Sequence, residues 1–139
     1  MKRLALLLAL PFVLPACDLS VDPPKQTIWE ATLHGDPAHA ELTGHAAAIS
    51  YSDRTEASVS VSHAPDETTL AWRIQGGSCA APGAPVGSSA SYPPLHTDST
   101  GAASANVLLS PILVSGQDYH VAVATAEEDA IACGALVER

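Results

Sequence analysis

The segment 70–75 constrains the fold of this chain more than any other stretch. In it, large apolar residues alternate with small or polar ones; the apolar set is Leu70, Trp72 and Ile74. A two-residue period is that of a β-strand with one face on a core, so Arg73 and Gln75 share the opposite face. Two glycines and Cys79 follow directly. The strand therefore ends in a turn that carries a cysteine.

The same period recurs along the chain and predicts a β-rich domain. The further segments that show it are 27–33, 41–51, 57–63, 103–109, 119–123 and 131–137. The alanine-rich middle of 41–51 also suits a helix, but Gly44 and the run Ile49-Ser50-Tyr51 favour a strand. Segment 76–94 holds four prolines and predicts a long, irregular and variable surface loop. Seven or eight short, mostly antiparallel strands predict an all-β sandwich.

The first residues predict a targeting signal rather than part of the folded domain. Lys2 and Arg3 precede an apolar run, 4–14, that is too short to span a bilayer as a stable helix. The run ends in Leu14-Pro15-Ala16-Cys17, which resembles the lipobox of bacterial lipoproteins. We therefore expect residues 1–16 to be removed and Cys17 to be lipidated; an ordinary secretory signal cut nearby is the alternative. The chain is then a cell-envelope lipoprotein, anchored in a membrane and facing the periplasm or the exterior.

The remaining 123 residues are enough for one domain. Residues 17–26 contain Pro23-Pro24 and little apolar surface, which predicts a short, semi-stiff tether. The domain itself is expected over 27–139. Without 1–16 the chain carries four basic and fifteen acidic residues, a net charge of −11, so nucleic acid is excluded as a partner.

The chain contains three cysteines. If Cys17 carries lipid, Cys79 and Cys133 remain as an even pair in a compartment that permits disulfides. The alternation in 131–137 places Cys133 on an inward face, from which a bridge to Cys79 is reasonable. Two thiols in a metal or redox site are the alternative, although the close spacing that such sites normally show is missing.

Four motifs carry a resemblance to a known family. They are WRIQGGSC (72–79), GAA (101–103), GQDYHVAV (116–123) and IACG (131–134). In order, and in their cysteine pair, they resemble copper/zinc superoxide dismutase-like domains and the related chordin-type (CHRD) repeats. The resemblance covers about 27–137 and implies a Greek-key β-sandwich.

The resemblance also indicates where a copper site is expected. The family holds copper with a His-x-His pair on the outer face of the middle strand and a third histidine at the end of the strand that begins at Tyr119. Those positions are Arg73, Gln75 and Ala124 in this chain. None of the three binds copper as histidine does. The family's substrate-guiding arginine corresponds to Ala130, and its histidine-rich zinc loop corresponds to a segment, 83–95, that has no histidine. We therefore expect no metal, no cofactor and no catalytic residue.

Other residues could still supply chemistry. Three histidines, His34, His39 and His45, lie within twelve residues and could gather at one end of a sheet, but their spacing matches no known ligand pattern. Two functions follow as hypotheses. The first is a non-catalytic, lipid-anchored module that binds an envelope protein or has a structural role. The second is a superoxide dismutase-like enzyme or copper-handling protein that recruits other histidines. A small-ligand binder that uses the 76–94 loop is a weaker third hypothesis.

Overall fold

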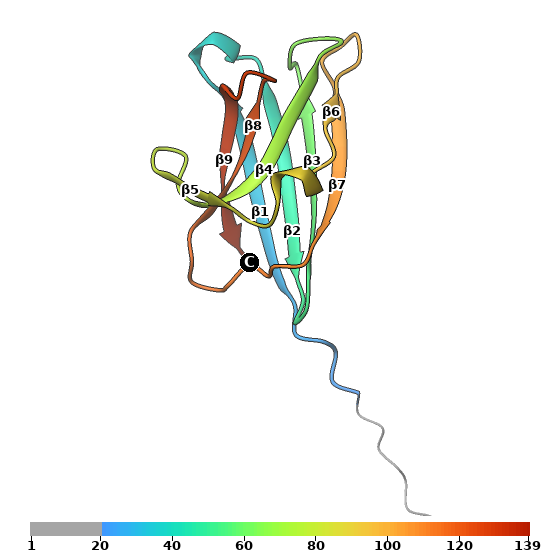
Figure 1. The fold of residues 1–139 in the computed structure, drawn as a ribbon, viewed down its shortest axis with the longest axis vertical. Coiled ribbons are helices and arrows are strands. Elements are labelled where there is room, and N and C mark those ends of the chain that lie inside the picture. Colours follow the sequence, from blue (N-terminus) through green and yellow to red (C-terminus); the bar gives the residue numbers. More distant parts are fainter. Residues whose placement is uncertain (1–20) are drawn as a thin grey trace, which may run out of the picture.

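The computed structural model describes residues 21–139. The expected signal segment, 1–16, and the expected lipidation site, Cys17, lie outside the described residues. Residues 21–26 are exposed, carry no regular structure and lead directly into the first strand (Figure 1). Within 21–139, no helix is long and apolar enough to cross a membrane.

The described chain is all-β, as the alternating segments predict. Its nine strands are β1 (Thr27–Gly35), β2 (Thr43–Ser50), β3 (Thr55–Ser62), β4 (Thr69–Gly77), β5 (Pro82–Pro85), β6 (Leu95–His96), β7 (Ala103–Leu109), β8 (Tyr119–Ala124) and β9 (Ala130–Glu138). All of them pair antiparallel, in the order β5-β4-β8-β9-β1-β2-β3-β7, with β6 beside β4. The sheet curls strongly, so its two halves face each other (Figure 1).

The alanine-rich segment 41–51 forms strand β2 and not a helix. It pairs along its whole length with β1 on one side and β3 on the other. Ala46 and Ala48 point into the core and are almost fully buried. Small side chains on this strand leave room for Trp29 on the neighbouring strand, because Trp29 pairs directly with Ala48.

The core fills the inside of the curled sheet with the apolar set of each alternating segment. Leu70, Trp72 and Ile74 of β4 are at most 2% exposed, as the alternation predicts. Two edge-to-face aromatic pairs contribute to the core: Trp29 with Tyr119 links β1 to β8, and Trp72 with Tyr92 links β4 to the segment before β6. Alternation therefore specifies most of this inner face, and the turns, the loops and the short strand β6 complete it with Leu42, Tyr92, Leu95 and Leu113.

The segment 76–94 is less irregular than the sequence predicts. It contains β5, which pairs with the end of β4, and a 3-10 turn, η2 (Ser89–Ser91). The Trp72 indole N–H donates a hydrogen bond to the Pro93 carbonyl at 2.8 Å, and the Tyr92 hydroxyl donates one to the Val86 carbonyl at 2.7 Å. The first bond holds the segment against β4, and the second holds the segment together. Together with β6, the strand β5 raises the count above the seven or eight expected.

The prediction that Cys133 lies on an inward face is wrong. A register shift between Val123 and Ala124 on β8 lies opposite the start of β9. As a result, Ile131 and Ala132 are both buried and the alternation restarts after them. Cys133 then pairs with Ala122 and lies on the outer face of the sheet.

Candidate functional site

The outer face of β8 lies beneath a covalently fixed loop. Cys79, in the turn after β4, forms a disulfide with Cys133 on β9, with a Cα–Cα distance of 6.0 Å. His120 of β8 is 1% exposed, and its Nδ1–H donates a hydrogen bond to the Gly77 carbonyl at 3.1 Å. The Gly77 N–H donates in turn to the Asp118 carbonyl at 2.9 Å. The turn 78–81, here called the cysteine loop, is therefore held to β8 at its start and to β9 by the disulfide.

The three positions at which the resemblance leads us to expect copper ligands lie near one another on this outer face. Arg73 pairs with Ala122, and Gln75 pairs with His120. Ala124 lies opposite Ala71, diagonally across from Arg73. The Gln75 amide donates a 3.3 Å hydrogen bond to the Gly83 carbonyl of β5. The amide thus serves to attach β5 to β4.

These side chains do not fit a copper ion. A guanidinium keeps its proton at ordinary pH and has no acceptor atom, an amide oxygen is a weak ligand for copper, and a methyl group has no donor atom at all. The hollow lined by Arg73, Ala124 and Glu128 measures only about 40 Å³. Ligand pockets are usually about 300 to 1,000 Å³.

Two of the three clustered histidines do share a surface. His34 on β1 and His45 on β2 are diagonal neighbours on the outer face, and both line a hollow of about 470 Å³ beside the disulfide. The ion pair between Arg139 and Glu30, at 2.8 Å, borders the same hollow. His39 lies in the turn η1 (Pro37–His39), where its Nδ1 is 2.7 Å from an Asp36 carboxylate oxygen. Of the three histidines expected to lie together, only His34 and His45 therefore do so.

The other histidines are separated from this pair. The His96 Nδ1 lies 3.1 Å from the Thr69 hydroxyl between β6 and β4, and His63 is exposed in the turn after β3. Among residues 21–139, no three histidine, cysteine or acidic side chains come together in a way that could hold a metal ion.

One carboxylate, Asp98, organises the turn before β7. Its Oδ1 accepts hydrogen bonds from the Thr100 N–H at 2.8 Å, the Thr100 hydroxyl at 2.7 Å and the Ala102 N–H at 3.1 Å. The Thr100 hydroxyl and these two backbone donors lower the pKa of Asp98 below its ordinary value. The group orders a turn and has no partner of opposite charge in it.

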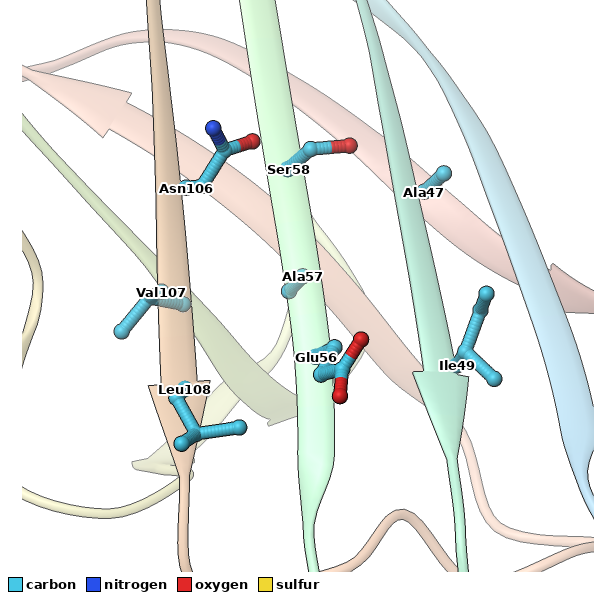
Figure 2. A pocket seen from close by; sticks show the side chains of 8 residues that line it. All are labelled: Ala47, Ile49, Glu56, Ala57, Ser58, Asn106, Val107 and Leu108. Carbon is cyan, nitrogen blue, oxygen red and sulfur yellow. The ribbon is translucent and has the colours of Figure 1, made fainter.

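A second large hollow lies on the outer face of the other half of the sheet. It measures about 470 Å³, and Figure 2 shows Ile49 of β2 and Leu108 of β7 on either side of Glu56 of β3. The sequence motifs do not mark this hollow as a site. The available signal was that Ile49 and Leu108 are large and apolar but lie in the outward phase of their strands.

Comparison with protein-family models and with curated proteins finds no match to this chain.

Proposed function

We propose that this protein is a lipid-anchored bacterial envelope protein whose superoxide dismutase-like Greek-key domain is a non-catalytic binding or structural module. The observation that carries the proposal is the set of side chains on the outer face of β4 and β8. Arg73, Gln75 and Ala124 lie on the outer faces of the paired strands β4 and β8, at the positions where the resembled family holds copper. A fixed positive charge at Arg73 then lies where a metal cation is held in the family that the sequence resembles.

The strand order supports the Greek-key assignment. Strands β1, β2, β3 and β7 are neighbours in one half of the sheet, and β5, β4, β8 and β9 are neighbours in the other. The chain crosses between the halves after β3, returns for β7 and crosses again for β8. A strand that returns over a long connection to lie beside an earlier one is the mark of this topology.

The assignment of a non-catalytic role is tested by metal loading. The mature protein is purified, exposed to copper and zinc, and freed of excess metal. Superoxide decay is then measured on the same sample as bound metal. We expect decay at the background rate, because the donor set lacks the strong ligands that a redox-cycling ion needs. Rapid decay with stoichiometric copper would overturn the proposal.

The anchor is tested separately at Cys17. In the bacterial host, Cys17→Ser should move the protein from the membrane fraction to the soluble fraction, because the acyl chains hold it by about 0.8 kcal/mol per buried methylene. Mass spectrometry of the wild-type protein should find an acylated Cys17 at the mature terminus. An unmodified terminus that lacks Cys17 would refute the anchor and leave the metal result untouched.

One observation favours the second candidate, a copper-handling protein. His34 and His45 line a common hollow beside the disulfide, and neutral imidazole is a good copper ligand. Two histidines leave other coordination positions to water, which predicts weak binding. Copper bound by the wild-type protein and lost in His34→Gln together with His45→Gln, but retained in His63→Gln together with His96→Gln, would favour this candidate.

A further inference from the structure

Exposed apolar side chains gather at one end of the domain. This end, here called the anchor end, contains the entry of residues 21–26 into β1, the hairpin 51–54 and the loop 110–118 (Figure 1). The large apolar side chains that are exposed among residues 21–139 are Val21, Ile28, Leu108, Ile112, Val114 and Val137. All of them lie on residues 21–26 or at the anchor end.

Strand register aligns part of this apolar surface. Ile28 pairs with Ile49, Ile49 with Glu56, and Glu56 with Leu108. Three apolar side chains and one carboxylate therefore form a row on the outer faces of β1, β2, β3 and β7. The hollow in Figure 2 lies along this row, between Ile49 and Leu108.

The loop 110–118 adds two more apolar side chains in a fixed orientation. Leu113 is buried, and its N–H donates to the Ser50 hydroxyl at 2.9 Å. The Val114 N–H donates to the Tyr119 hydroxyl at 3.0 Å. Because Leu113 is held inward, its neighbours Ile112 and Val114 are held outward, 41% and 52% exposed.

Charge is distributed unequally between the two ends. The turns at the far end, 36–42, 63–68, 98–102 and 125–129, contain no lysine or arginine. They carry eight carboxylates: Asp36, Glu41, Asp66, Glu67, Asp98, Glu127, Glu128 and Asp129. Three of the four lysine and arginine residues in 21–139, namely Lys25, Arg54 and Arg139, belong to the anchor end or to the residues that lead into it. There they offset part of the negative charge: Arg54 pairs with Asp53 and Glu56, and Arg139 pairs with Glu30.

We infer that the anchor end rests on the lipid bilayer, with its apolar side chains in the headgroup region and the acidic far end pointing away. The inference rests on the proposed lipid anchor at Cys17. Nine residues lie between Cys17 and Thr27, a reach of at most about 35 Å, and they end at this end of the domain. The negative potential of an anionic leaflet repels the far end most strongly. Scattered apolar side chains among charged ones suit the bilayer interface better than its hydrocarbon core.

Depth-dependent quenching tests this orientation. The lipidated full chain is reconstituted in phosphatidylcholine vesicles with brominated acyl chains, and a fluorophore is attached at Ser52→Cys (anchor end) or Glu127→Cys (far end). Cys79 and Cys133 are protected by their disulfide. We expect the label at Ser52→Cys to be quenched and that at Glu127→Cys to emit as it does in water.

Matched variants separate docking from tethering. Leu108→Ser with Ile112→Ser and Val114→Ser should lower quenching at Ser52→Cys about twofold or more, whereas Leu108→Ile with Ile112→Val and Val114→Ile should preserve it. Equal quenching at both labels, or self-association through the anchor end instead of quenching, would overturn the inference while leaving the anchor intact. A full chain that does not float with vesicles refutes the anchor, and the inference with it.

Discussion

Strands β8 and β3 show how differently two outer faces of one sheet are used. Both strands bury an apolar inner face. On β8 the outer residues His120, Ala122 and Ala124 are also buried, at most 8% exposed. On β3 the outer serines Ser58 and Ser60 are partly or fully exposed to solvent. The cysteine loop crosses beside β8, and only the shallow hollow of Figure 2 lies beside β3. On β8, a turn held by a disulfide covers His120 and makes this part of the outer face a second buried layer.

Removing the tether should have the largest effect. Cys79→Ser with Cys133→Ser opens a loop with a sequence separation of 54. The chain-entropy relation then predicts a loss of about 4 kcal/mol in the free energy of unfolding. Urea denaturation monitored by tryptophan fluorescence measures it. Wild-type protein under reductant is the control and should lose a similar amount of stability. An unchanged urea midpoint in both samples would show that the disulfide does not stabilise the fold.

Single substitutions should lower the free energy of unfolding by different amounts on the two outer faces. His120→Ala removes a fully buried side chain and leaves the Gly77 carbonyl without its donor, so we expect a loss of about 2 to 3 kcal/mol. Ser60→Ala on β3 should change stability by about 0.5 kcal/mol or less. Thermal or urea unfolding of both variants gives the comparison. Equal losses would mean that β8 is no more covered than β3.

The smallest expected effect concerns a turn that is held by a carboxylate instead of a disulfide. The folded pKa of Asp98 lies below its ordinary value of 3.8, so its contribution to stability is complete above that pH and is lost as the pH falls through the folded pKa. Asp98→Asn should therefore be less stable than wild type at neutral pH, and the difference should narrow on acidification. A difference that is constant across this range would contradict the assigned role of the carboxylate.

The sequence predicts the inner face well because a strand repeats every two residues. Leu70, Trp72 and Ile74 are buried as expected, and Arg73 and Gln75 lie together outside. The disulfide partners are also as predicted.

What the sequence does not reveal depends on contacts between distant segments. The register shift opposite Val123 and Ala124 leaves Ile131 of β9 without a partner and turns Cys133 outward, and no local residue pattern marks it. The hollow between Ile49 and Leu108 requires the register of three strands. The proximity of His34 and His45, and the separation of His39, depend in the same way on how β1 pairs with β2.

We propose that the outer face of β4 and β8 has lost a copper site at three positions, Arg73, Gln75 and Ala124. Copper binding is measured most directly by titrating wild-type protein and the Arg73→His, Gln75→His, Ala124→His variant side by side, with bound copper quantified after removal of the excess. The account predicts no stoichiometric copper on the wild type and a gain of copper by the variant, because imidazole supplies the missing donors. Stoichiometric copper on the wild type, undiminished in Arg73→Ala with Gln75→Ala, would place a metal elsewhere on the protein and contradict the account.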